Sequence, residues 1–120
     1  MEAILPLGIG LLIGWFIIKK LLPVKGVQNI SVQELQNRLK EKNVQWIDVR
    51  TPGEYRANHK KPFKNLPLSN LPKRTSELDR DKEVVIICQS GMRSMNAAKV
   101  LKKQGFSKIT NVKGGMSAWS

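Results

Sequence analysis

A run of β-branched residues, a short loop that contains cysteine, and an amphipathic stretch follow one another in the middle of the chain. Residues 84–87 are Val-Val-Ile-Ile, Cys88 to Arg93 form the loop, and residues 94–101 carry apolar side chains at helical spacing. A β-branched run of this kind suits a strand that is buried on both faces, as strands in parallel sheets are. The sequence therefore predicts an α/β fold with Cys88 at the carboxyl end of a parallel strand.

The position of Cys88 favours a reactive thiolate. In open α/β sheets ligands bind at the carboxyl ends of the strands, where loop N–H groups and the next helix N-terminus attract anions. Cysteines in such places, or beside a cation such as Arg93, can have pKa values lowered to roughly 3.5–7.5. Cys88 is therefore a candidate nucleophile that needs no histidine to deprotonate it, and Gly91 lets the loop turn tightly. The alternative is a small buried hydrophobic residue in the core.

Further elements alternate along the chain. Ser31 to Glu34 form a capping box that opens a helix reaching about Glu41. The other predicted elements are a strand over 44–49, a helix over 51–57, a short extended segment over 66–68, a helix that ends at Gly105, and a strand over 109–112. Residues 69–81 are compatible with either helical turns or loop. Strands that alternate with helices predict a parallel sheet covered on both faces.

Four segments resemble, in order and spacing, the signatures of rhodanese-like sulfurtransferases. They are the cysteine loop 88–94, the Asp-Val-Arg to Glu-Tyr segment 47–55, the partly matching segment 58–68, and the Gly-Gly-x-x-x-Trp ending at 112–119. The resemblance extends from about Gly26 to Trp119. It implies a rhodanese-like parallel five-stranded sheet with helices on both faces.

The resemblance also implies sulfur transfer. Cys88 would take a sulfane sulfur from a donor such as thiosulfate or a persulfide, and a thiophilic acceptor, small molecule or protein, would remove it. The loop N–H groups would stabilise the terminal sulfur, and Met92 is expected to face the substrate. The expected substrate-binding loop is Gln89, Ser90, Gly91, Met92 and Arg93.

Some neighbouring residues have two interpretations. Asp48 and Arg50 are possible supporting residues for the loop, but an ion pair with Glu54 is an equal alternative. The lone His59 is interpreted as a packing residue and not as a base. Because the sequence contains no Cys/His cluster, we expect neither a metal site nor a cofactor.

The sequence suggests two alternatives to sulfur transfer, a protein-binding module and a cysteine phosphatase. Gln89 stands where many members of the family carry arginine, so the loop has one cation fewer for an anionic donor. This favours the alternative of a non-catalytic, membrane-tethered module that binds a protein partner through the loop.

The length of the loop bears on a second alternative, a cysteine phosphatase. Cysteine phosphatases place five residues between Cys and Arg, whereas four separate Cys88 from Arg93. The shorter loop favours sulfur over phosphate chemistry.

The amino terminus predicts a membrane anchor. Residues 3–18 are uncharged and almost entirely apolar, and Lys19-Lys20-Leu21-Leu22 follow. At about 1.5 Å per residue, the run through Leu22 spans about 30 Å, the thickness of a bilayer core. We therefore expect one transmembrane helix with a basic flank in residues 1–25, followed by a rhodanese-like domain in residues 26–120.

The distribution of charge predicts the orientation of this anchor. Every Lys and Arg follows Ile18, which places the domain in the cytoplasm, and the single cysteine agrees with a reducing compartment. The net charge of +12 would fit nucleic acid, but the chain has no aromatic stacking platform or recognisable nucleic-acid module, so none is expected. Attraction to an anionic inner leaflet, or a merely solvated basic surface, are the alternatives.

Overall fold

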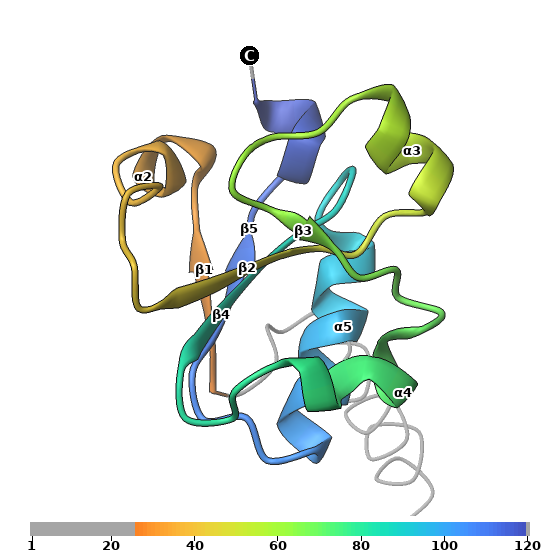
Figure 1. The fold of residues 1–120 in the computed structure, drawn as a ribbon. Coiled ribbons are helices and arrows are strands. Elements are labelled where there is room, and N and C mark those ends of the chain that lie inside the picture. Colours follow the sequence, from red (N-terminus) through yellow and green to blue (C-terminus); the bar gives the residue numbers. More distant parts are fainter. Residues whose placement is uncertain (1–25, 120) are drawn as a thin grey trace, which may run out of the picture.

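Five parallel strands form one sheet in the order β1-β5-β4-β2-β3 (Figure 1). The computed structural model describes residues 26–119. The strands are β1 (Val27–Ile30), β2 (Val44–Asp48), β3 (Lys64–Asn65), β4 (Glu83–Ile87) and β5 (Ile109–Val112), and every pairing between them is parallel. The predicted five-stranded parallel sheet is confirmed. The extended segment expected over 66–68 follows β3 directly, and its Leu66 and Leu68 N–H groups donate to the carbonyls of Asp48 and Val49 at 2.9 and 3.0 Å.

Helices of unequal length connect the strands. They are α2 (Val32–Gln36), α3 (Pro52–Ala57), α4 (Leu71–Arg74) and α5 (Met92–Lys103), with the 3-10 helices η1 (Thr75–Glu77) and η2 (Gly115–Ala118). The helix predicted to reach Glu41 ends at Gln36. Turns follow it, and the Arg38 guanidinium there lies within 2.6 Å of Glu83 at the start of β4.

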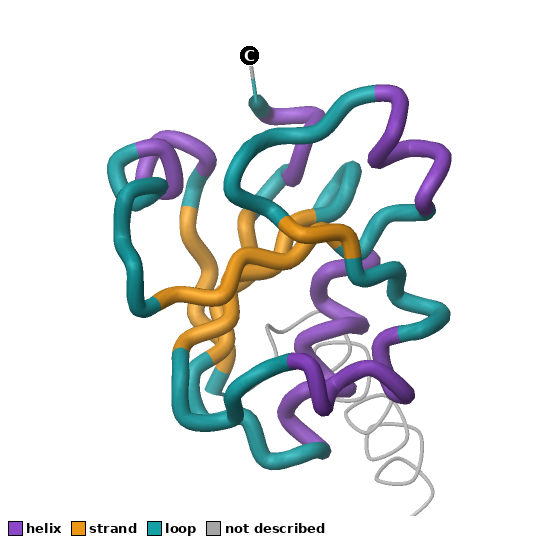
Figure 2. Tube along the Cα trace, in the orientation of Figure 1, coloured by secondary structure: helices purple, strands orange, loops and turns teal. Residues whose placement is uncertain are grey.

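The helices cover both faces of the sheet, as the sequence predicted. On one face α4 and α5 pack over a core that includes Ile47, Val84, Ile86 and Leu101. On the other face α2 and η2 enclose a second core that includes Leu35, Trp46 and Val85. Figure 2 shows the strands lying between these two groups of helices.

Strand β4 lies in the middle of the sheet and leads directly to the cysteine loop. Val84 to Ile87 are all fully buried, and so is Cys88. Because side chains alternate along a strand, Val84, Ile86 and Cys88 belong to the core beneath α5, while Val85 and Ile87 belong to the opposite core. The predicted strand buried on both faces is confirmed, and it places Cys88 below the start of α5.

The membrane anchor expected in residues 1–25 lies outside the described residues. Within residues 26–119, no helix is both long and apolar enough to cross a bilayer.

Candidate active site

The loop after β4 folds back onto the sulfur of Cys88. The backbone N–H of Gly91 donates to Cys88 Sγ at 2.9 Å, and the thiol donates to the hydroxyl of Ser94 over 3.4 Å. Gly91 has φ +102°, a left-handed conformation that β-carbons disfavour. A residue other than glycine at position 91 would therefore strain the turn that holds a backbone donor against the sulfur.

The 3-10 helix η2 holds this loop from outside. The N–H of Met116 donates to the carbonyl of Cys88 at 2.8 Å, and the N–H of Ser117 donates to the carbonyl of Gln89 at 2.9 Å. Gly115 lies so close that a β-carbon on it would be 2.2 Å from the Cys88 carbonyl oxygen. The sequence contained a signal for this contact, the Gly114-Gly115 pair, but not its role in fixing the loop.

The cation that the sequence placed beside Cys88 is bound to a carboxylate. Arg93 Nη1 and Nη2 donate to the two oxygens of Glu54 at 2.6 and 2.9 Å. These bonds, followed by the backbone N–H of Thr51, lower the pKa of Glu54 to about 2. Proximity to Glu54, and more weakly to Cys88, raises the pKa of Arg93. Glu54 therefore joins α3 to the first turn of α5.

Arg50 forms a separate buried ion pair. Its guanidinium donates to Asp48 at 2.8 Å, and the two side chains are 3% and 0% exposed. Arg50 also donates to the carbonyl of Asn58 at 2.6 Å and to Oε1 of Gln89 at 3.4 Å. The alternative ion pair of Arg50 with Glu54 does not form, because Glu54 binds Arg93 and Arg50 binds Asp48. The contact with Gln89 connects Arg50 and Asp48 to the loop.

The remaining loop side chains face solvent to different degrees. Met92 is 74% exposed, the one large hydrophobic side chain among residues 26–119 that is so open. Ser90 is exposed, whereas Gln89 is half-buried and donates to the hydroxyl of Ser117 at 3.2 Å. Met92 is thus available to contact a substrate or a partner at the mouth of the loop.

A chain of buried polar side chains extends from the sulfur to the edge strand β1. The Ser94 hydroxyl accepts a hydrogen bond from the Cys88 thiol. The same hydroxyl contacts the carbonyl of Gly91 at 2.9 Å and the Oδ1 atom of Asn111. The amide of Asn111 donates to Asn29 at 2.9 Å. Ser94 and Asn111 are 0% and 3% exposed. Sequence reasoning missed Asn111 and Asn29, since no local pattern indicates that they meet across two strands.

An apolar cleft of about 310 Å³ lies beside the loop, at the carboxyl ends of β2 and β3. It is lined by Val49, Thr51, Pro52, Pro67, Leu68, Ser69 and Arg93. Arg93 belongs to both the cleft and the start of α5. Carboxyl ends of parallel strands are the usual place for ligands in open α/β sheets.

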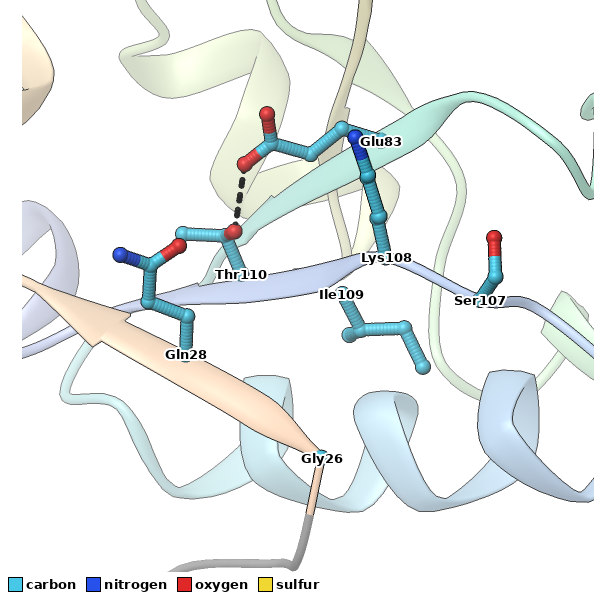
Figure 3. A pocket seen from close by; sticks show the side chains of 7 residues that line it. All are labelled: Gly26, Gln28, Glu83, Ser107, Lys108, Ile109 and Thr110. Atoms are coloured by element: carbon cyan, nitrogen blue, oxygen red, sulfur yellow. Dashed lines mark hydrogen bonds between the residues drawn. The ribbon is translucent and has the colours of Figure 1, made fainter.

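A second cavity, also of about 310 Å³, lies at the opposite ends of the strands, where their amino termini are (Figure 3). It is bordered by Gly26 and by the first residues of β4 and β5, so it opens at the amino ends of these strands. The Thr110 hydroxyl donates to the Glu83 carboxylate there at 2.5 Å. Because Glu83 is also paired with Arg38, this cavity holds satisfied polar groups and does not adjoin Cys88.

His59 contacts Tyr55 of α3. His59 is exposed, stacks on Tyr55 with ring centroids 4.0 Å apart, and bonds through Nδ1 to the carbonyl of that residue. Within residues 26–119, no group of three or more His, Cys, Asp or Glu side chains could hold a metal ion.

Comparisons with known proteins agree on one family. A family model described as Rhodanese-like domain matches residues 31–120. A sulfurtransferase of Allochromatium vinosum is 37% identical over 95 residues, which cover 78% of this chain and 89% of that protein. Thiosulfate sulfurtransferase GlpE of Shewanella oneidensis is 34% identical over 92 residues, covering 77% and 91%. The crystal structure of a rhodanese-like domain protein from Staphylococcus aureus superposes with a TM-score of 0.72 at 33% identity, covering 78% and 91%. The chain therefore belongs to the rhodanese-like domain family.

Proposed function

We propose that this protein is a sulfurtransferase that carries a sulfane sulfur on Cys88. The observation that carries the proposal is the loop turned around the sulfur, with the Gly91 N–H donating to Sγ at 2.9 Å. Such donors stabilise negative charge on a thiolate and on the sulfur it takes up. Relatives named sulfurtransferase and thiosulfate sulfurtransferase support the same class of reaction.

The proposed reaction has two steps. The Cys88 thiolate attacks the outer sulfur of the donor, a new S–S bond forms, and the old bond breaks with its electron pair leaving on the rest of the donor. With thiosulfate, the leaving group is sulfite. A thiophilic acceptor then attacks the outer sulfur of the Cys88 persulfide, and the electron pair of that bond returns to Cys88 as thiolate.

The test of this proposal is turnover with thiosulfate as donor and cyanide as acceptor. We expect thiocyanate from the wild-type protein and none above background from Cys88→Ser. Ser76→Ala, an exposed change in η1 outside the loop, is the control and should keep activity. Full turnover by Cys88→Ser would contradict the proposal. A wild-type thiol inert to all sulfane donors would leave the alternative function, a module that contacts a protein partner through the exposed Met92.

We also propose that residues 1–25 anchor the protein in a membrane, with the catalytic domain in the cytoplasm. The support is the uncharged apolar run of residues 3–18 and the basic residues that follow it. A cytoplasmic domain would keep the Cys88 thiol in a reducing compartment, where acceptor thiols are available.

A further inference from the structure

The arginines around the Cys88 loop are both neutralised by carboxylates. Arg93 is held by Glu54 through two bonds of 2.6 and 2.9 Å, and Arg50 is held by the buried Asp48 at 2.8 Å. Gln89, which directly follows Cys88 in the loop, carries no charge. Attraction between charges falls when each cation already has a partner, so a doubly charged donor such as thiosulfate gains little here.

The cleft beside Arg93 has the opposite character to an anion site. Its walls are the aliphatic side chains of Val49, Pro52, Pro67 and Leu68, and its volume of about 310 Å³ lies in the range of small-molecule sites. The N–H of Val49 donates at 3.0 Å to the carbonyl of Ile87, the residue before Cys88. Val49 follows β2 directly and belongs to the same core cluster as Cys88, so the cleft lies beside the strand end that leads into the Cys88 loop.

We propose that this cleft binds the organic group of the sulfur donor, so that the preferred donor carries an apolar organic group on the sulfur atom that holds the sulfane sulfur. The inference rests on the proposed transfer through Cys88 and adds the class of donor. Burial of an apolar group in the cleft replaces the charge attraction that the paired arginines do not supply. Thiosulfate has no such group to bury.

Benzenethiosulfonate is a suitable probe of this cleft. The Cys88 thiolate attacks its outer sulfur, the S–S bond of the probe breaks, and the electron pair leaves on benzenesulfinate, so that the charge is unchanged overall. Methanethiosulfonate has the same charge and reacting atoms but lacks the ring. The ratio of kcat/KM for the two probes in the full-length protein therefore isolates the contribution of the apolar group.

We expect kcat/KM to be about tenfold or more higher for benzenethiosulfonate than for methanethiosulfonate. Ser69→Trp, at the exposed rim of the cleft, should remove most of this preference and leave methanethiosulfonate nearly unaffected. Ser76→Trp, at an exposed serine in η1 that does not line the cleft, is the matched control and should keep the preference.

Equal kcat/KM for the two probes in the wild-type protein would overturn the inference, and this comparison needs no variant. A parallel loss for both probes in Ser69→Trp would overturn it as well, because the cleft would then not select the organic group. Transfer from both probes without a ring preference leaves the proposed function intact. Failure of every donor to place sulfur on Cys88 overturns both.

Discussion

At the scale of single residues, the environment of Cys88 depends on side chains from other elements. Glu54 holds Arg93 from α3, and Asp48 holds Arg50 at the end of β2. The loop sequence alone suggests a cation free to lower the pKa of the thiol. In the structure Arg93 is paired with Glu54. The group that donates directly to the sulfur is the backbone N–H of Gly91.

The ion pair of Glu54 should appear in the pH dependence of stability. Its pKa is about 2 in the folded protein against an ordinary value of 4.5, so its contribution is complete above pH 4.5 and is lost as the pH falls toward 2. We expect the difference in free energy of unfolding between the wild-type protein and Glu54→Gln to shrink over that interval, as measured by urea denaturation.

The control for this prediction is the same comparison in an Arg93→Gln background. Because Arg93 is the largest cause of the lowered pKa, most of the pH-dependent difference should disappear there. A difference between wild type and Glu54→Gln that stays constant between pH 4.5 and 2 would contradict the ion pair.

Gln89 provides a second prediction at this scale. Gln89→Arg places an additional cation in the loop, and the KM for thiosulfate should fall roughly three- to tenfold because the new charge acts on binding of an anionic donor. The KM for an uncharged sulfane donor should change little, and Gln89→Leu serves as the neutral control. Steady-state kinetics with both donors would decide, and an unchanged or higher KM for thiosulfate would exclude charge at this position as the limit.

At the level of elements, η2 supports the Cys88 loop. Two of its N–H groups bind the carbonyls of Cys88 and Gln89. These N–H groups bind the carbonyls of the loop from outside, while the Gly91 N–H donates to the sulfur inside the loop. The close approach depends on Gly115, which has φ +55° and no room for a β-carbon.

Gly115→Ala should therefore destabilise the protein and displace the loop. The left-handed conformation alone costs about 1–2 kcal/mol for a residue with a β-carbon, and the contact with the Cys88 carbonyl adds to it. We expect a lower Tm together with a loss of sulfur transfer. Gly53→Ala in α3 is the control, because a β-carbon there meets nothing within 4 Å; it should be neutral or raise stability by up to about 1 kcal/mol. Equal Tm values for the two variants would contradict the role of Gly115.

Much of the element order follows from local sequence. The β-branched run of β4, the Thr51 and Pro52 start of α3, and the Gly105 end of α5 are local signals that the structure confirms. Strand β1 has only Val27 and Ile30 as apolar residues, so it depends on pairing with β5 and gives no pattern of its own. The same holds for β3, which has two residues.

The composition of the site was only partly predictable, for a physical reason. The loop residues are contiguous and therefore visible in the sequence. The pairing of Glu54 with Arg93 and the contact between Ser94 and Asn111 join segments 39 and 17 residues apart. Such contacts depend on how α3, α5 and β5 pack, which local propensity does not specify.

At the scale of the whole molecule, an excess of basic residues and an apolar amino terminus predict attachment to a membrane. The described domain supplies a convenient reporter of orientation. Cys88 is fully buried, whereas Ser76 is exposed. A Ser76→Cys, Cys88→Ser protein therefore carries its single thiol at the surface.

This reporter should be protected from a membrane-impermeant maleimide in sealed cells and should react once the membrane is opened. The protein should also stay in the membrane pellet after alkaline carbonate extraction, because a spanning helix is not released by it. Release by carbonate would contradict a spanning helix and would indicate a segment that binds only at the membrane surface. Labelling in sealed cells would reverse the orientation and remove the domain from the reducing compartment.

The proposed sulfur transfer requires that Cys88 itself carries the transferred sulfur. The most direct measurement is the intact mass of the full-length protein after exposure to a sulfane donor in the absence of an acceptor, followed by identification of the modified peptide. We predict the addition of one sulfur atom, located on the peptide that contains Cys88 and released by cyanide. An unmodified Cys88, or a sulfur retained by Cys88→Ser, would contradict the claim.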